Sequence, residues 1–146
     1  MTAKACIFCA IVAGELPAHV VLDDDGVLAF LDTRPLFVGH VLVVPKKHVV
    51  TLPELPHAQL EPLFARVQLL AAAVPVAMEA EGTFVAMNNI VSQSVPHLHV
   101  HVVPRKKKDG LKGFFWPRHA YDDDEQARET AARIRAALSG SAASPA

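Results

Sequence analysis

Three histidines occupy alternate positions in one short stretch of the sequence. The stretch SVPHLHVHVVP, residues 94–104, carries His97, His99 and His101 with only apolar residues between them. Imidazole has an unperturbed pKa of about 6.5, so it can act as nucleophile, base or acid near neutral pH, and it also binds metals. Three interpretations are open: a half-exposed strand with polar residues outward, a metal site, or a catalytic site.

A second pair of residues able to do chemistry lies near the N-terminus, where Cys6 and Cys9 are spaced C-x-x-C. The N-terminal residues lack the charged and long apolar regions of a signal peptide, so we expect a cytoplasmic protein. In a reducing compartment this spacing indicates a metal site or a redox pair rather than a structural disulfide.

The alternation around the histidines predicts a β-strand. Successive side chains of a strand point to opposite faces, which puts the three imidazoles on one face with neighbouring Cα atoms roughly 6.5–7 Å apart. Leu98, Val100 and Val102 then share the other face. They can pack under an amphipathic helix that the three-four spacing of apolar residues predicts over residues 57–74.

Other segments supply the elements that must position this strand. Asp-Gly between the apolar runs 19–22 and 27–31 predicts a β-hairpin. Val41–Val44 is a continuous apolar run typical of a buried strand, which we expect Pro45 to end. We expect Pro75 to kink or end the long helix.

The remaining elements complete the predicted fold class. Residues 83–87 indicate a strand, residues 88–94 a loop, and the acidic residues 122–124 the start of a last helix. The order of the elements predicts an α+β fold, an antiparallel sheet with helices on one side.

Size and composition limit the classes of function. The 146 residues have a formal net charge of −1 and are 51% apolar, which argues against a disordered chain and against a strongly basic nucleic-acid binder. No uninterrupted apolar run approaches the roughly 18 residues that span a bilayer, so we expect neither membrane nor nucleic acid as partner. We expect one domain over residues 1–138, with a core of 4–105, an extension of 106–138 and a flexible tail of 139–146.

The histidine stretch resembles a known signature. Residues 97–103 fit H-φ-H-φ-H-φ-φ, with φ apolar, at every position, as in the histidine triad (HIT) superfamily. Residues 6–18, 30–35 and 39–48 are also similar to this superfamily in order and spacing, so that the resemblance covers about residues 4–105. It looks closest to the branch that includes the Hint nucleoside phosphoramidases.

The resemblance implies a fold, an oligomeric state and a reaction. It implies a HIT fold: an antiparallel sheet of about five strands, one long helix and a C-terminal helix, joined across a homodimer. Members bind nucleotides and cleave at the α-phosphate, with the middle histidine, here His99, as nucleophile and His101 in support. The expected enzyme is therefore a nucleotide hydrolase or transferase that forms a nucleotidyl-histidine intermediate on purine nucleotides, with adenosine 5'-phosphoramidate as the first substrate to try.

Alternatives to this activity stay open. One is hydrolysis of dinucleoside polyphosphates or adenylyl sulfate, and another is a nucleotide-binding regulatory module whose hydrolysis is incidental. The nucleophile argues against the last, because a pure binder does not need one.

The resemblance also implies a structural zinc ion. The matching residues are Cys6, Cys9, His48 and His97, and two thiolates with two imidazoles make a closed tetrahedral set that leaves no position for a metal-bound water. Two free thiols or a redox pair are the alternatives.

Nucleotide contacts are implied by position. Asp32 matches an acid that accepts hydrogen bonds from ribose hydroxyls, and Gln93, Ser94 and Asn89 match donors to phosphate oxygens. The apolar walls of the base pocket are Ile7, Phe8, Ile11, Phe30 and Leu31. The loop 88–94 is about two residues shorter than in many relatives and lacks glycine, which allows close approach of backbone to phosphate.

One more segment is distinctive. Four positive charges at residues 105–108 indicate either a solvated turn or steering of an anionic substrate. The Phe114–Trp116 cluster that follows is suited to packing or to a stacking surface.

Overall fold

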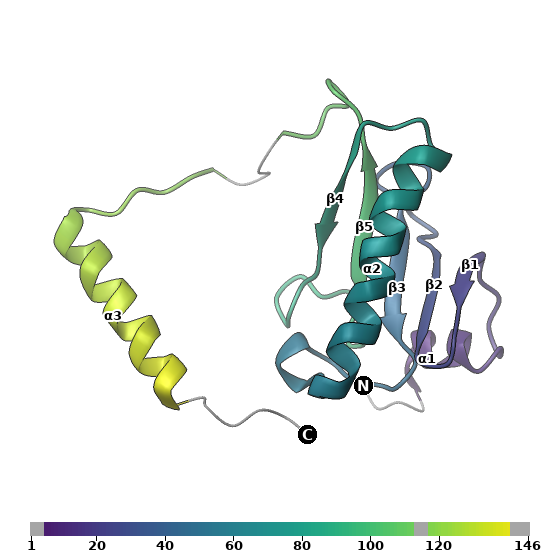
Figure 1. Cartoon of the computed structure of the whole chain (residues 1–146), viewed down its shortest axis with the longest axis horizontal. Coiled ribbons are helices and arrows are strands. Elements are labelled where there is room, and N and C mark those ends of the chain that lie inside the picture. The colour runs from purple at the N-terminus through teal and green to yellow at the C-terminus, as the bar shows by residue number, and fades with distance from the viewer. Residues whose placement is uncertain (1–4, 113–116, 141–146) are drawn as a thin grey trace. The chain divides into compact units, whose positions relative to one another are not determined.

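The structure is a computed structural model that describes residues 5–112 and 117–140 (Figure 1). The aromatic cluster Phe114–Trp116 lies outside the described residues. The chain divides into two compact units, one ending at Lys107 and one beginning at Lys108. The predicted histidine strand and the cysteine pair both belong to the first unit.

The first unit is built on a five-stranded antiparallel sheet in the order β1-β2-β3-β5-β4 (Figure 1). The strands are β1 Val20–Asp23, β2 Val27–Leu31, β3 Val41–Pro45, β4 Gly82–Ala86 and β5 Val100–Arg105. The predicted α+β class with an antiparallel sheet is confirmed.

The predicted hairpin joins β1 and β2, and one side chain holds its turn. Asp24 Oδ1 accepts hydrogen bonds from the backbone N–H of Gly26 at 3.1 Å and of Val27 at 2.9 Å. A short acid that bonds backbone N–H groups ahead of it in the chain is a typical turn device. Its Oδ2 also pairs with Arg66, which ties the turn to the long helix.

That long helix, α2 His57–Ala77, follows the short 3₁₀ helix η2 Leu52–Glu54 and covers one face of the sheet (Figure 1). Its buried side chains pack against Leu98, Val100 and Val102, as the alternation predicted. The helix residues concerned are Leu63, Val67, Leu70 and Val74.

Pro75 does not end α2, contrary to one of the two expectations for it. The helix continues two residues further, to Ala77, because a proline this near the end removes only one of the last helical hydrogen bonds. The Pro75 carbonyl oxygen accepts a bond from Ala80 N at 2.8 Å, within the turn that follows.

By length and composition alone, α2 is also apolar enough to cross a membrane, with 21 residues and a mean hydropathy of 1.4. The expectation from the sequence was based on uninterrupted apolar runs, and polar residues interrupt the apolar sequence of this helix. Its inward side chains pack on the sheet, and 22% of its most apolar 18-residue window is buried.

The opposite face of the sheet is covered by α1 Ile7–Val12, so the helices do not all lie on one side as expected. Alternate residues of β2 and β3 point to this side, and they form a second apolar cluster with α1. The buried members of this cluster are Cys6, Phe8, Leu28, Phe30, Leu42 and Val44. The sequence offered little signal for α1 because six residues are too few for an amphipathic period.

The histidine segment begins before its strand. β5 starts at Val100, so that His97 and His99 lie just before the strand and only His101 lies in it. Leu98 N nevertheless donates to Val49 O at 2.7 Å, which extends the pairing toward the segment after β3. The predicted two faces therefore hold: the apolar residues between the histidines belong to the α2-side core.

The basic run at residues 105–108 lies at the far end of β5. Arg105 lies six positions after His99, or about 20 Å along the strand. Lys107 is paired with Glu81, its backbone N–H donating at 2.9 Å and its Nζ lying 3.5 Å from the carboxylate.

The second unit contains α3 Asp124–Gly140, which confirms a helix beginning near the acidic residues. Asp123 Oδ1 accepts a bond from Gln126 N at 2.8 Å, as an N-cap does. The helix includes Ser139 and Gly140, which the sequence analysis assigned to the tail, and none of its described residues is buried.

Candidate functional site

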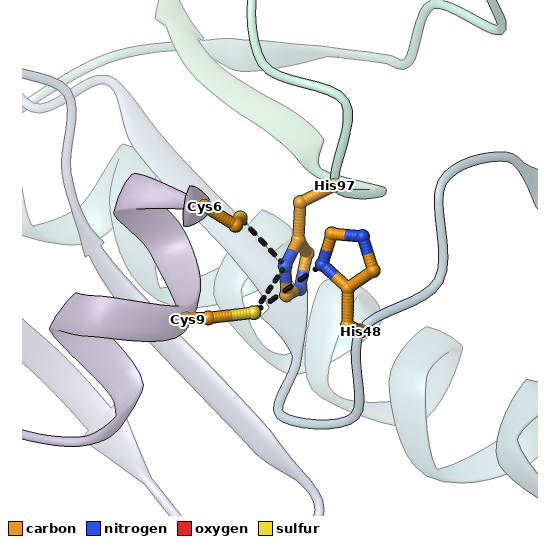
Figure 2. Close-up of side chains that lie close together, drawn as sticks. All are labelled: Cys6, Cys9, His48 and His97. Atoms are coloured by element: carbon orange, nitrogen blue, oxygen red, sulfur yellow. Dashed lines mark hydrogen bonds between the residues drawn. The ribbon is translucent and has the colours of Figure 1, made fainter. Parts of the chain in front are cut away.

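Four potential metal ligands from three separate parts of the chain meet at one point (Figure 2). Cys6 and Cys9 come from the start of α1, His48 follows β3, and His97 precedes β5. Their donor atoms all lie within 4.8 Å of one another. The two cysteines are free thiols rather than a disulfide.

The separations between these donor atoms fit a zinc ion. Cys6 Sγ lies 3.4 Å from His97 Nδ1, and Cys9 Sγ lies 3.3 Å from His48 Nδ1 and 3.5 Å from His97 Nδ1. Two ligands of a tetrahedral zinc, one at about 2.3 Å through sulfur and one at about 2.05 Å through nitrogen, are roughly 3.5 Å apart. The four residues can therefore hold a metal ion.

Two further features suit these residues to a cation. His97 Nε2 donates to Pro45 O at 2.8 Å, which leaves the Nδ1 lone pair for a metal. Burial, and then the neighbouring Cys6, raise the pKa of the Cys9 thiol to about 11. Because an ionised thiolate there needs a compensating positive charge, the donor set matches a cation rather than a neutral ligand.

His99 is held so that one ring nitrogen is free. Its Nδ1 lies 2.7 Å from the backbone oxygen of His97, and since that oxygen can only accept, Nδ1 carries the hydrogen. A neutral imidazole has one N–H, so Nε2 holds the lone pair. The side chain of Phe8 stands edge-to-face against this ring, with centroids 5.2 Å apart.

The free nitrogen of His99 is reached by solvent even though the residue is only 4% exposed. Among the described residues, no buried side-chain nitrogen or oxygen lacks a hydrogen-bond partner. The ring bonds through Nδ1 and makes no such bond through Nε2, so Nε2 is not a buried atom. It presents an unprotonated lone pair at the surface of the site.

His101 is oriented by a fourth histidine. The backbone N–H of Leu36 donates to His40 Nδ1 at 3.1 Å, which places the His40 hydrogen on Nε2. His40 Nε2 then donates to His101 Nδ1 at 2.9 Å. The hydrogen of His101 is therefore on Nε2, and the centroids of the His99 and His101 rings are 5.1 Å apart.

Asp32, His40 and His101 also lie close enough together to be considered as metal ligands. The hydrogen-bond network argues against that use, because the Nε2 of His40 carries a hydrogen and has no lone pair to offer. Asp32 Oδ2 lies 3.7 Å from the same Nε2, and Asp32 Oδ1 accepts from Arg34 N at 2.9 Å. These three residues form a chain of hydrogen-bonding groups beside His99.

Burial keeps His40 and His101 uncharged. Burial, then the neighbouring His99 and His40, lower the pKa of His101 from 6.5 to about 4, with the Asp32 carboxylate opposing the shift. Burial likewise lowers the pKa of His40 below 6.5, again against Asp32. Both rings are neutral at pH 7, as the hydrogen-bond pattern requires.

Comparison with known proteins identifies the family that carries this arrangement. A family model described as HIT domain matches residues 13–108. The chain belongs to the HIT family. It is 43% identical over 108 residues to an uncharacterized HIT-like protein of Mycobacterium tuberculosis, which covers 73% of this chain and 75% of that protein.

Several relatives bear the names of enzymes. Adenosine 5'-monophosphoramidase HNT1 of Candida albicans is 34% identical over 127 residues, covering 83% of this chain and 84% of that protein. Adenylylsulfatase HINT3 of Arabidopsis thaliana is 34% identical over 137 residues, covering 89% and 68%. These names support nucleotide hydrolase activity for the HIT domain described here.

Solved structures of the HIT family share the fold. A Streptococcus mutans protein superposes with a TM-score of 0.85 at 37% identity, covering 92% of this chain and 86% of that one. A Zn-bound histidine triad family protein from Mycobacterium smegmatis gives a TM-score of 0.71 at 35% identity, covering 93% and 99%.

Two of the residues predicted to contact phosphate, Gln93 and Asn89, form hydrogen bonds to the backbone of the loop 88–94 and of the neighbouring segment 50–52. Gln93 Oε1 accepts from Ile90 N at 3.0 Å, and Gln93 Nε2 donates to Val50 O at 2.6 Å. Asn89 Oδ1 accepts from Leu52 N at 2.8 Å, while Ser94 is exposed. The glycine-free loop takes the left-handed conformation at Ile90, with φ 72°, and at Ser92, with φ 61°.

The predicted walls of the base pocket do not all lie together. Phe8 and Phe30 meet edge-to-face at 5.4 Å, and Ile11 packs against the same cluster. Ile7 is 47% exposed. Leu31 packs against the α2-side core, on the face away from Phe30, because neighbouring residues of a strand point in opposite directions.

Two contacts within the candidate site were not predicted from the sequence. The pairing of His40 with His101 joins residues 61 positions apart, and its sequence signal was a histidine just before a buried strand. The contact of Phe8 with His99 had no signal, since Phe8 reads as an ordinary core residue.

Proposed function

We propose that the protein is a nucleotide hydrolase or transferase that cleaves at the α-phosphate of purine nucleotides, with adenosine 5'-phosphoramidate as the first substrate. The observation that carries the proposal is the pair of ring tautomers, a bare Nε2 on His99 and a protonated Nε2 on His101, in rings whose centroids are 5.1 Å apart. A nucleophile and a donor at adjacent positions are what displacement at phosphorus requires.

In the first step, the lone pair of His99 Nε2 attacks the α-phosphorus and the phosphorus–nitrogen bond breaks. The hydrogen stays on Nδ1 and remains hydrogen-bonded to the His97 carbonyl oxygen, which stabilises the positive charge that develops on the ring. The departing nitrogen needs one proton. The negative charge of a bound phosphate favours a charged His101, which can supply that proton.

In the second step, water attacks the same phosphorus and the bond to His99 Nε2 breaks. The water leaves its hydroxyl on the phosphate and returns a proton to His101. The products are an amine and a nucleoside monophosphate, and both histidines regain their starting forms.

The nucleotide contacts belong to this proposal. Asp32, whose Oδ2 lies 3.7 Å from His40 Nε2, accepts hydrogen bonds from ribose hydroxyls in this proposal. Phe8, Phe30 and Ile11 supply the apolar cluster near a purine, and Ser94 is an exposed donor at the end of the loop before the triad.

Zinc at Cys6, Cys9, His48 and His97 has a structural role in the proposal. It supplies no chemistry to the reaction, because a set of four protein ligands leaves no open position. It ties α1 to the segment before β5. Elemental analysis of protein purified without added metal should give about one zinc per chain, and Cys6→Ser with Cys9→Ser should abolish it. Unchanged metal content in the double variant would contradict this assignment.

A cytoplasmic homodimer is the assembly we propose. β4 is an edge strand of the sheet, with Val85 41% exposed, and α2 leaves Leu69 and Val76 exposed at 55% and 81%. An apolar helix face beside the last strand of the described sheet is suited to pairing with a second copy. Sedimentation equilibrium should give twice the mass of the chain, and a monomer at micromolar concentration would contradict it.

Adenylyl sulfate is the second candidate substrate, favoured by the name of the Arabidopsis relative. Both substrates present an adenylyl group to the same nucleophile and differ only in the leaving group. A panel of adenosine 5'-phosphoramidate, adenylyl sulfate and a dinucleoside polyphosphate ranks them by kcat/KM. Binding of all three without turnover would instead favour a nucleotide-binding regulatory module.

The decisive experiment compares wild type with His99→Asn on labelled adenosine 5'-phosphoramidate. We expect the variant to lose turnover while it still binds the substrate, because asparagine fills similar space but has no nucleophilic nitrogen. Mass spectrometry of the quenched wild-type reaction should find a nucleotidyl adduct on the peptide that contains the triad. Equal turnover in the two proteins would remove His99 from the mechanism.

A further inference from the structure

Helix α1 has little stability of its own. It has six residues, no side-chain cap at its N-terminus, no acidic residue in its first turn and no basic residue in its last. Isolated helices shorter than about 12–15 residues are marginal in water. The position of α1 is therefore set by what its side chains contact.

Two kinds of contact hold α1. Cys6, the residue that caps the helix, and Cys9, inside it, face the imidazoles of His48 and His97 (Figure 2). Phe8 lies between the two cysteines in the chain and is 5% exposed. A metal at the cysteines and the packing of Phe8 thus act on the same short turn of helix.

The Phe8 ring reaches from the metal cluster to the nucleophile. It stands edge-to-face against His97, with centroids 5.9 Å apart and planes at 71°, and against His99, at 5.2 Å and 85°. Perpendicular aromatic rings at such distances attract each other and have a preferred orientation. The same side chain therefore touches a metal ligand and the residue that attacks phosphorus.

His99 needs a second restraint besides its hydrogen bond. The bond from Nδ1 to His97 O fixes which nitrogen is protonated, but one bond leaves the ring free to tilt about the line that joins the two atoms. A ring packed against its face or edge removes that freedom. Phe8 occupies this position.

We propose that Phe8 is a positioning residue for His99, and that through Phe8 the Cys6–Cys9–His48–His97 site sets the orientation of the nucleophile. The proposal rests on the nucleophilic role of His99 given above. It assigns the metal site a consequence for the reaction without placing the metal in any chemical step.

The carbonyl of His97 adds a second link between the two sites. His97 is both the ligand whose Nδ1 faces the cysteines and the residue whose backbone oxygen fixes the His99 tautomer. Removal of the metal releases both restraints on His99 together. The inference is that a metal-free chain keeps its α2-side core but loses a defined His99 ring.

The first test is Phe8→Leu, which keeps an apolar side chain and removes the ring. We expect kcat and the single-turnover rate of adduct formation to fall about 10- to 100-fold, the range for a reacting group displaced by up to about 1 Å, with KM changed much less. The matched control is Leu28→Ala, which removes apolar volume from the same cluster and has no part in the site. It should lower stability and leave kcat within about twofold of wild type.

Ring-¹⁵N NMR of the full chain gives a readout independent of activity. In wild type, the His99 ring should show one sharp tautomer with the hydrogen on Nδ1. Phe8→Leu should broaden or shift the His99 signals at normal zinc content, and Leu28→Ala should not. A Phe8→Leu protein with wild-type kcat and an unchanged His99 spectrum overturns the proposal, as does an equal loss of kcat in both variants.

The link to the metal is tested on the wild-type chain treated with a chelator, with Cys9→Ser as the second route to metal loss. We expect both to change the His99 ring signals as Phe8→Leu does, and restored zinc to reverse the change in the chelated protein. Metal loss that leaves these signals unchanged, or a chain that never contains metal, removes the link. If wild type forms no nucleotidyl adduct, the proposed function fails, while the NMR comparison still decides whether Phe8 orients His99.

Discussion

His40 Nε2 donates a hydrogen bond to His101 Nδ1 over 2.9 Å, and this one bond decides what His101 can do. It places the only hydrogen of the neutral His101 ring on Nε2. His40 is 3% exposed and is itself fixed by the backbone N–H of Leu36. A buried histidine outside the triad thus sets the tautomer of the residue that supports catalysis.

Replacing His40 should therefore reduce activity, although His40 itself is assigned no contact with the substrate. We expect His40→Leu, which has no donor, to lower kcat about 10-fold or more, because His101 then has no fixed tautomer. His40→Gln can still place an amide N–H toward His101 and should lose less. Steady-state kinetics with a basic alkylamine and with a weakly basic arylamine as leaving group checks the reason.

The loss in His40→Leu should be larger for the alkylamine, since a basic leaving group depends more on an incoming proton. Equal losses with both leaving groups would mean that His40 does not act through proton supply. Equal losses in His40→Leu and His40→Gln would point to packing instead.

Stability should depend on pH through His101. The folded protein lowers its pKa to about 4 by burial and by the rings of His99 and His40, against Asp32, while the unfolded chain keeps a value near 6.5. The folded state therefore binds fewer protons, and acid favours unfolding. The free energy of unfolding should be unaffected by His101 above pH 6.5 and should fall as the pH goes from 6.5 toward 4.

Urea unfolding of wild type and His101→Gln at half-unit pH steps measures this effect. Loss of metal at low pH affects both proteins, so the difference between their free energies of unfolding isolates His101. We expect that difference to shift against wild type as the pH falls below 6.5. Parallel pH profiles would show that His101 titrates normally.

Gly39 has little room for a side chain. Its φ is +98°, and a Cβ built there would lie 2.5 Å from Met78 Cγ and 2.9 Å from its Sδ. Gly39→Ala should lower the free energy of unfolding by about 2 kcal/mol or more, from backbone strain and the clash together. It should also lower kcat, because the residue precedes His40.

A double variant separates the two causes. Met78→Ala removes the side-chain atoms that the new Cβ would meet, so that Gly39→Ala should cost less in that background by the size of the clash. The remaining cost reflects the left-handed conformation. Additive effects in urea unfolding would show that no clash occurs.

Asp24 should stabilise the hairpin through its acceptors more than through its charge. Asp24→Ala removes two turn hydrogen bonds and the pair with Arg66, and we expect a cost of about 1 kcal/mol or more. Asp24→Asn keeps an acceptor oxygen and should cost less. Asp25→Ala, a change at the exposed neighbouring acid, is the matched control and should cost under about 0.5 kcal/mol.

The folded state favours the charged form of Asp24, whereas it favours the neutral form of His101. The bond from Arg66, helped by the N–H groups of Gly26 and Val27, lowers the pKa of Asp24 below 3.8. The stabilisation is therefore present at neutral pH and should be lost as the pH falls below about 3.8. An Asp24→Asn protein as unstable at pH 7 as Asp24→Ala would argue that the charge matters more than the turn.

Much of the fold could be predicted because it depends on local order along the chain. The hairpin follows from Asp-Gly between two apolar runs, and α2 from the three-four spacing of its buried residues. The expectation that failed for Pro75 concerned a boundary, where one lost hydrogen bond competes with packing of the whole helix. The face of the sheet on which α1 lies could not be predicted either, because six residues are too few to show a helical period of apolar side chains.

The candidate site divides in the same way. The zinc ligands and the triad are recognisable from residue types and spacing, and the structure brings all four potential ligands within 4.8 Å. Gln93 and Asn89 were predicted to donate to phosphate, and in the structure their amides bond to the backbone of Val50, Ile90 and Leu52. Where a flexible polar side chain finds its partner depends on which backbone groups the fold leaves unpaired.

By itself, the sequence determined that three imidazoles share one face of an extended segment, because side-chain alternation is a property of a few consecutive residues. It also determined which residue types were available to hold a metal. Only the tertiary structure decided which ring nitrogen of each histidine carries a hydrogen. That choice depends on hydrogen-bond partners such as the His97 and Pro45 carbonyls and the Leu36 amide. Pro45 lies 52 positions from His97, which it bonds, and His40 lies 61 positions from His101. Contacts between such distant positions exist only once the chain has folded.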